Sequence, residues 1–299
     1  MSKLTLGPLL FHWKRDQRRD FYARIADEAP VDCVYLGEVV CSKREPGYYD
    51  DLPDIADRLI AGGKQVVLST LALVTTDREM AAIRSHCDGP LMIEANDATA
   101  ISLLAGTQHV TGPFINVFNE QTIDFLVRKG AARINLPVEL SAAAISTLAR
   151  YCPVETEVQV FGRQALSISM RCYHARSYGL HKDGCQFVCE LDADGLAAKQ
   201  LDGNPLLTVN GTQTMSHGYA VLLRELIELQ AAGVSHFRLS PQITDMVQVA
   251  KLYRGVLDGA LTAGEAEEEL HELAGAVPFV NGYVRGREGL AWADSCPTI

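Results

Sequence analysis

Short apolar runs alternate with amphipathic segments along most of the chain, and this alternation limits the folds open to it. The runs that look like buried strands are 4–10, 31–37, 64–70, 90–95, 114–118, 132–137, 157–161 and 235–240. Such continuous runs are typical of parallel strands that are covered on both faces. Segments with helical spacing follow nearly every run, at 20–29, 52–63, 76–86, 97–106, 120–131, 140–152, 217–233 and 242–259. Eight strand–helix units predict a closed α/β barrel, a (β/α)8 fold of the TIM type.

An open, doubly wound sheet is the alternative fold for the same alternation. That fold usually carries a glycine-rich phosphate-binding turn after its first strand, and the chain has no such turn there. With 299 residues, of which 47% are hydrophobic, the chain is long enough and apolar enough for one large core. We therefore expect a single barrel-like domain over residues 1–299.

One connection is much longer than the others. It follows the seventh predicted strand and covers approximately residues 165–215, where 190–195 and 204–211 resemble short hairpin strands. A long insertion in a compact domain is usually functional. In a barrel, an insertion that follows a strand lies at the carboxyl-terminal face, where active sites form.

Four cysteines suggest what the insertion does. Cys172, Cys185 and Cys189 have the spacing C-x12-C-x3-C inside it, and Cys41 follows the second predicted strand. In a reducing compartment, clustered cysteines are more often metal ligands or redox groups than disulfides. Strands two and seven are three apart around the ring, so the insertion is long enough to reach Cys41. On a helix, the C-x3-C spacing would place both thiols on one face. The spacing alone leaves zinc and an iron–sulfur cluster equally open.

Other side chains near these cysteines have two interpretations each. Cations flank the four thiols, where they would lower thiol pKa values or would simply be solvated: Lys43, Arg44, Arg171, Arg176 and Lys182. His174 and His181 lie in the same loop, either as ligands or, as we expect, as ordinary loop histidines. Glu157 is expected to be a buried polar group of the barrel or the partner of an interior arginine. The remaining cysteines are expected to take no part in the site: Cys33, Cys87, Cys152 and Cys296.

Charge and hydropathy exclude several functional classes. The net charge of −10 would repel nucleic acid and anionic membrane surfaces. No apolar run is long enough to span a bilayer, and the first residues lack the cleavage site of a signal peptide. We therefore expect a cytoplasmic protein with no membrane span. The motifs of serine hydrolases, zinc proteases and P-loop proteins are absent from the sequence.

The segment from Glu157 to Cys172 resembles the signature of the collagenase-like peptidases of unknown catalytic type, the U-type family. The matching positions are Glu157, Gly162, Ser167, Ser169, Arg171 and Cys172. Three positions depart from the signature: its histidine is Phe161 here, its inner cysteine is Ala165, and one glycine is Met170. A peptidase should keep that histidine, so we do not expect peptidase activity.

The departures resemble the branch of this family that acts in ubiquinone biosynthesis. The similarity extends from Tyr35 to Cys189 and is weaker near the end of the chain; it includes GEVVCSKR at 37–44, NVFN at 116–119, LPVELS at 136–141 and NGYVRG at 281–286. The resemblance implies a barrel-like fold and a [4Fe–4S] cluster bound by Cys41, Cys172, Cys185 and Cys189.

The same resemblance implies a function and partners. It implies a component of the oxygen-independent hydroxylation of a ubiquinone precursor, working as a heterodimer with a homologous, UbiU-like subunit. The precursor carries a long apolar tail, so we expect a lipid-binding accessory protein to deliver it. Two other interpretations stay open. The chain could be a peptidase-like or RNA-modifying relative of the same family, or a non-catalytic subunit in which the cluster serves only to stabilise the protein.

Overall fold

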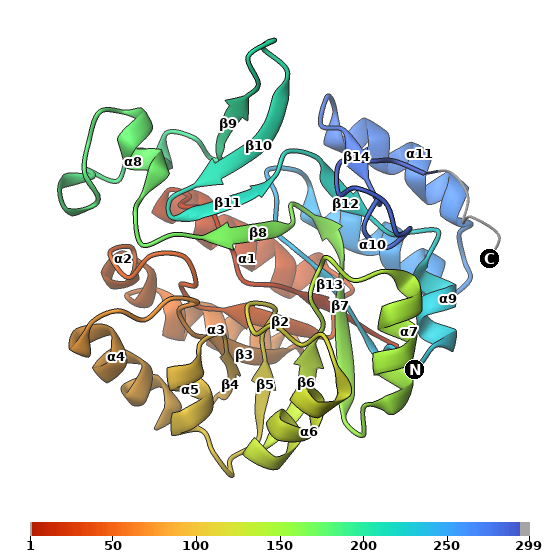
Figure 1. The fold of residues 1–299 in the computed structure, drawn as a ribbon, viewed down its shortest axis with the longest axis horizontal. Coiled ribbons are helices and arrows are strands. Elements are labelled where there is room, and N and C mark those ends of the chain that lie inside the picture. The colour runs from red at the N-terminus through yellow and green to blue at the C-terminus, as the bar shows by residue number, and fades with distance from the viewer. Residues whose placement is uncertain (1, 294–299) are drawn as a thin grey trace.

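Eight strands close into a parallel barrel in the computed structural model, which describes residues 2–293 (Figure 1). Around the ring they pair in the order β13, β1, β2, β3, β4, β5, β6, β7, and β7 pairs with β13 to complete it. Their bounds are β1 Lys3–Leu6, β2 Cys33–Leu36, β3 Gln65–Ser69, β4 Met92–Ala95, β5 His109–Thr111, β6 Ala131–Asn135, β7 Glu155–Gly162 and β13 His236–Leu239. The predicted (β/α)8 architecture is confirmed.

Helices surround the barrel and bury their apolar faces against it (Figure 1). The sequence marks where several begin. Thr76 forms a capping box with Glu79 at α4, and the Ser141 side chain caps α7. The bounds are α1 Arg15–Glu28, α2 Glu45–Tyr49, α3 Leu52–Ala61, α4 Asp77–Cys87, α5 Ala98–Leu103, α6 Glu120–Lys129, α7 Ala142–Tyr151, α9 Leu226–Ala231, α10 Met246–Leu257 and α11 Ala263–Ala274. The sequence patterns did not predict α2 or α11.

The fifth strand is not where the apolar pattern placed it. The prediction of 114–118 is wrong, because β5 is the three-residue strand His109–Thr111. That strand is too short to form an apolar run of its own. Residues 114–118 instead lie in the loop between β5 and α6, and Phe114 faces a cavity at the barrel mouth. Phe114 at the cavity, together with Ile115 and Val117 packed in the core, gave this loop the composition of a strand.

The segment 217–233 is only partly helical. It begins with β12 (Tyr219–Val221), which pairs antiparallel with β7 and parallel with β14 (Phe279–Val280), and only α9 is helical. Every residue from Tyr219 to Leu223 is buried. A run that is buried on all sides has no polar face, so its periodicity does not separate strand from helix.

A second, four-stranded antiparallel sheet fills the long connection between β7 and β12 (Figure 1). Its strands are β8 Ala165–Ile168, β9 Leu196–Lys199, β10 Pro205–Asn210 and β11 Gln213–Ser216. The predicted strand at 204–211 corresponds to β10, but 190–195 precedes β9 instead of forming a strand. Between β8 and β9 the chain forms α8 (Tyr173–Ser177) and two single 3-10 turns, η1 (Lys182–Gly184) and η2 (Val188–Glu190). We call residues 165–216 the inserted lobe.

None of the helices within residues 2–293 has both the length and the apolar character needed to cross a membrane.

Candidate functional site

A network of buried charges lies inside the barrel. Arg238 on β13 donates from Nη2 to Glu94 on β4 (2.6 Å) and to Glu157 on β7 (2.7 Å). Glu157 also accepts bonds from the hydroxyls of Thr5 (2.5 Å) and Tyr35 (2.7 Å). The interior arginine expected for Glu157 is therefore Arg238, which the sequence patterns did not identify. Because strands from different parts of the barrel supply these groups, the network ties its opposite sides together.

Charge compensation decides the protonation of Glu157. Burial alone would raise the pKa of this carboxyl, but Arg238 and Arg133 outweigh the burial and lower the pKa to about 2. The guanidinium of Arg238 also lies over the Tyr35 ring, 3.9 Å from its centre. Glu157 is thus an ionised structural group at neutral pH and does not act as a proton donor.

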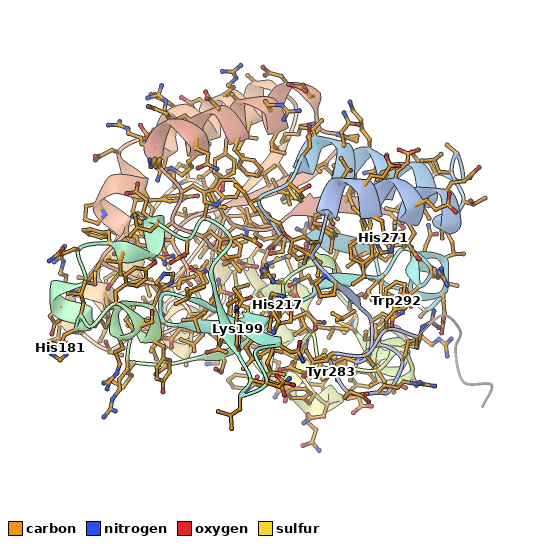
Figure 2. The ribbon with its side chains drawn as sticks, turned by 90° about the horizontal axis from the view of Figure 1, so that it is seen from above. His181, Lys199, His217, His271, Tyr283 and Trp292 are labelled. Atoms are coloured by element: carbon orange, nitrogen blue, oxygen red, sulfur yellow. The ribbon has the colours of Figure 1, made fainter. Side chains whose placement is uncertain are left out.

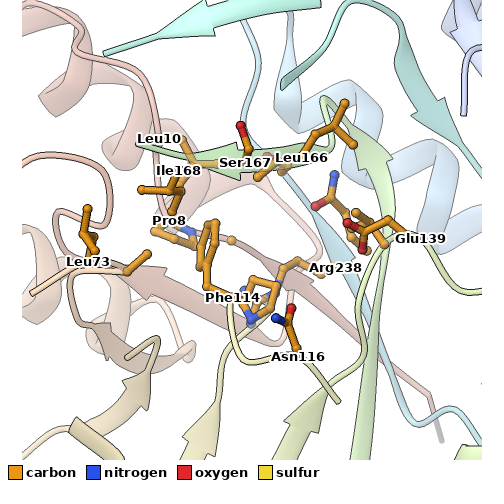
Figure 3. Close-up of a pocket in the computed structure, with 17 residues that line it drawn as sticks. Pro8, Leu10, Leu73, Phe114, Asn116, Glu139, Leu166, Ser167, Ile168 and Arg238 are labelled. Carbon is orange, nitrogen blue, oxygen red and sulfur yellow. The ribbon is translucent and has the colours of Figure 1, made fainter. Parts of the chain in front are cut away.

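A cavity of about 360 Å³ lies at the carboxyl-terminal end of the barrel (Figure 3). Loops that follow several barrel strands line one side, with Pro8, Leu73 and Phe114 among them. The strand β8 of the inserted lobe supplies the opposite wall through Leu166 and Ile168. We call this space the mouth cavity; it has the size of a small-molecule site, and its lining is divided almost equally between apolar and polar groups.

All four predicted ligand cysteines line one narrow second cavity. Cys41, from the connection after β2, meets Cys172, Cys185 and Cys189 of the inserted lobe there. Apart from these thiols, the lining consists of apolar groups, glycine and the cations Lys43, Arg44 and Lys182, without a carboxylate or an imidazole from the described residues. Four thiols are the donor set of iron–sulfur clusters and of many zinc sites, so this space, the cysteine cavity, fits either group chemically.

Irregular backbone brings the thiols of the lobe together. The Cys172 thiol accepts a bond from the Ala175 backbone N–H (3.3 Å) at the start of α8. Cys185 follows η1 and Cys189 lies in η2, so the helical spacing considered for this pair is wrong. Between them, Gln186 and Phe187 have φ angles of 50° and 54°, in the left-handed region. This sharp turn, and not a helix face, directs both cysteines into the cavity.

The electrostatics of the cysteine cavity depend on Arg44. Burial raises the pKa of the Cys41 and Cys189 thiols, and the nearby Arg44 guanidinium opposes that effect. Buried Glu38 lies 3.9 Å from Arg44 and raises both thiol pKa values slightly. The cavity therefore holds thiols whose ionised form needs a positive partner.

Arg44 also connects the two cavities. Its Nη1 donates to the Leu10 carbonyl (3.0 Å) and its Nη2 to Asn210 Oδ1 (3.1 Å). Asn210 in turn donates to the same Leu10 carbonyl (2.8 Å). Because Leu10 lines the mouth cavity and Arg44 lines the cysteine cavity, this hydrogen bond links the linings of the two spaces.

The two loop histidines have different positions. His174 is buried; its Nε2 pairs with Asp192 (2.8 Å) and its Nδ1 faces the backbone N–H of Gly211 (3.4 Å), so it fixes the inserted lobe internally. His181 is exposed at the outer edge of the lobe (Figure 2). Neither lines the cysteine cavity.

The remaining candidates lie away from the site. Arg171 and Arg176 are exposed and do not line the cysteine cavity, unlike the other predicted cations. Cys33 is buried in β2, where burial raises its pKa to about 12. Cys87 is the last residue of α4, and Cys152 directly follows α7. Cys296 lies outside the described residues.

The chain has similarity to several known proteins. The tRNA hydroxylation protein P2 of Bacillus subtilis (strain 168) is 29% identical over 147 residues, 47% of this chain and 48% of that protein. The chain thus matches about half the length of this curated relative. Dihydropteroate synthase from Thermus thermophilus has a TM-score of 0.43 at 13% identity, with 87% of this chain and 95% of that chain covered. A tryptophan synthase complex from Pyrococcus furiosus has a TM-score of 0.41 at 10% sequence identity, with 91% of this chain and 98% of that chain covered.

A family model covers nearly the whole chain. Peptidase family U32 matches residues 20–293, which include the barrel strands from β2 onward, the inserted lobe and all four clustered cysteines. This agrees with the resemblance of the Glu157–Cys172 segment to the U-type signature. The chain therefore belongs to peptidase family U32.

Proposed function

We propose that the chain is the UbiV-type iron–sulfur component of an oxygen-independent hydroxylase that acts on the ring of a ubiquinone precursor. Its cofactor is a [4Fe–4S] cluster held by Cys41, Cys172, Cys185 and Cys189. It works in the cytoplasm with a homologous, UbiU-like subunit, and a lipid-binding accessory protein delivers the precursor.

The observation that carries this proposal is the convergence of four cysteines, from two segments far apart in sequence, beside a cavity of ligand size. Arg44, which lines the cysteine cavity, donates a hydrogen bond to Leu10, which lines the mouth cavity. A redox group in the cysteine cavity would therefore be linked through these two residues to a molecule in the mouth cavity. When bound, such a cluster supplies one-electron redox chemistry.

The cations of the cysteine cavity support a cluster. Four ligated thiolates leave such a site with negative charge, which nearby cations stabilise. Arg44, Lys43 and Lys182 would balance the negative charge of the ligated thiolates.

Anaerobic purification tests the cofactor directly. We expect brown protein with about four irons and four labile sulfides per chain. Replacing any of the four cysteines by alanine should remove the cluster. Cys33→Ala is the matched control and should keep it, because Cys33 lies in a barrel strand away from the cavity. Stoichiometric zinc without labile sulfide would refute the proposal.

Deletion of the gene tests the pathway. Without oxygen, the deletion strain should lose ubiquinone and the Cys185→Ala strain should behave in the same way, whereas aerobic ubiquinone should be normal in both. If Cys185→Ala lost the cluster but kept normal anaerobic quinone, the cluster would only stabilise the subunit. That outcome would favour the non-catalytic alternative.

Exposed apolar side chains support the proposed partner. Six of the large exposed apolar side chains belong to the inserted lobe: Met170, Tyr173, Tyr178, Phe187, Leu191 and Leu201. Where such side chains form one patch, they mark an interface. Co-expression with the homologous subunit should give a one-to-one complex on a sizing column. Two separate peaks at micromolar concentration would contradict the heterodimer.

Hydroxylation of tRNA is the second candidate function, because the relative from Bacillus subtilis is a tRNA hydroxylation protein. The net charge of −10 disfavours it, since RNA binding needs a positive surface. Analysis of modified nucleosides in total tRNA from the deletion strain decides between the two. Loss of a hydroxylated nucleoside with normal quinone would establish the tRNA function.

A further inference from the structure

The mouth cavity is lined by apolar and polar side chains, and its buried cation is Arg238. The walls include Pro8, Leu73 and Phe114 on the barrel side and Leu166 and Ile168 on β8. Figure 3 shows the β8 side chains across the cavity from Phe114 and Arg238. Flat apolar surfaces on two sides favour a flat, mainly apolar guest.

Arg238 has hydrogen-bonding capacity to spare at this cavity. It is almost completely buried, lines the cavity, and uses Nη2 for both of its carboxylate partners. Its Nε has no hydrogen-bond partner among the described residues. An unsatisfied buried donor costs free energy until it finds an acceptor. The Arg238 Nη1 also makes no hydrogen bond to a described residue, so an oxygen acceptor on a guest beside this guanidinium would find a donor.

The charge balance limits which acceptor suits the site. Glu94 and Glu157 both pair with Arg238, so the guanidinium has no uncompensated positive charge. Glu139 adds a further carboxylate to the lining. An anionic guest would therefore meet net negative surroundings, whereas a neutral hydroxyl or carbonyl oxygen would not.

We propose that the mouth cavity binds an uncharged aromatic ring, with Arg238 donating a hydrogen bond to an oxygen on that ring. This inference rests on the proposed function for its choice of a phenol as probe, and it adds the binding site and the residue that positions the ring. Arg238 acts here by orienting the guest and excluding anions. The β8 wall makes the inserted lobe part of the same site.

Three small probes of one shape test the proposal by calorimetric titration: 2-allylphenol, 2-allyltoluene, which lacks the oxygen, and 2-allylbenzoate, which carries a charge. We expect saturable binding of the phenol, with at least tenfold weaker binding of the other two. Leu166→Trp should fill the cavity and weaken phenol binding at least tenfold. Leu201→Trp is the matched control on an exposed position of the lobe and should leave the affinity unchanged.

The positioning role has its own readout. Arg238→Lys keeps the charge but removes the guanidinium, so its preference for the phenol over 2-allyltoluene should disappear while apolar binding persists. If this variant does not fold, the titrations of the three probes with the wild type and with Leu166→Trp still test whether the mouth cavity binds the ring. No binding of the phenol to wild type, equal or tighter binding of the benzoate, or an unchanged affinity in Leu166→Trp would each overturn the inference.

The same titrations separate this inference from the proposed function. They need no turnover and are run on both iron-loaded and metal-free protein. Phenol binding at this cavity in a protein that proves to hold no iron would refute only the proposed function. Normal anaerobic quinone synthesis with no phenol binding would refute only the ring site.

Discussion

The barrel interior and the cysteine cavity are polar sites in one chain, but they are built in opposite ways. In the barrel, regular strands supply Glu94, Glu157 and Arg238, and each carboxylate has its partners already. In the cysteine cavity, short turns supply the thiols, and burial raises the pKa of Cys41 and Cys189. In the barrel, the carboxylates are already paired in the free protein, whereas burial opposes the ionisation of Cys41 and Cys189 in the cysteine cavity. The barrel charges therefore contribute mainly to stability, and the thiols gain most from a bound cation.

Removal of Arg238 should have the largest effect on stability. Arg238→Met leaves two buried carboxylates without their cation, so we expect the free energy of unfolding to fall by about 3–5 kcal/mol. Urea unfolding of the metal-free protein measures this loss. Arg58→Met, which breaks the exposed pair with Asp27, is the control and should have no measurable effect. If both variants lost the same free energy of unfolding, the buried network would stabilise the protein no more than an exposed ion pair does.

Acid should destabilise the barrel through Glu157. The pKa of this carboxyl is about 2 in the folded protein, below its ordinary value of 4.5. A depressed pKa contributes stability that is fully present above pH 4.5 and is lost as the pH falls towards 2. Urea titrations between these pH values should show that fall, on the order of 3 kcal/mol for this group. The same slope in Glu157→Gln would mean that other groups cause it.

His174→Phe should loosen the inserted lobe and leave the barrel intact. The change removes the bond to Asp192 and leaves that carboxylate and the Gly211 N–H without this partner. We expect a loss of about 1–3 kcal/mol, confined to the lobe. Limited proteolysis should then cut between residues 173 and 195 before the barrel. The exposed His181→Phe is the control, and cleavage first in the barrel would show that the two parts unfold together.

The smallest effect is expected at the strained turn between two of the cysteines. Gln186 adopts a left-handed conformation that costs a non-glycine residue about 1–2 kcal/mol. Gln186→Gly relieves this strain but makes the unfolded chain more flexible, so we expect a net stabilisation of at most about 1 kcal/mol. Thermal unfolding of the metal-free protein measures it. A lower melting temperature would mean that the Gln186 side chain itself stabilises the turn.

The two regions also differ in how far the sequence could predict them. The barrel followed from the alternation of strands and helices, because each strand is covered on both faces. The pattern failed at residues 114–118, where a loop packs apolar side chains against the core and a cavity, and at Tyr219–Val221, where complete burial hides the period. Both failures have one cause: composition reports burial and not the element that is buried.

Prediction of the site reached the cysteines but not their surroundings. Spacing and resemblance selected four thiols, and the structure brings them to one cavity, although their role as ligands stays a prediction. Arg44 bonds to Leu10, which is 34 positions away in the sequence, and to Asn210, which is 166 positions away. No local pattern encodes such a contact. Only the folded chain shows that the thiols adjoin the mouth cavity.

The two ends of the inserted lobe lie side by side. The Ser216 N–H donates to the Gln164 carbonyl (2.9 Å), and the Gln164 N–H donates back to the Ser216 hydroxyl (2.9 Å). The lobe is therefore a cassette whose two ends join the barrel at one place. The cassette carries three of the four cysteines, while Cys41 stays behind in the host. A transplanted lobe would regain its full set of thiols only in a recipient that already has the fourth, so the two parts must be inherited as a matched pair.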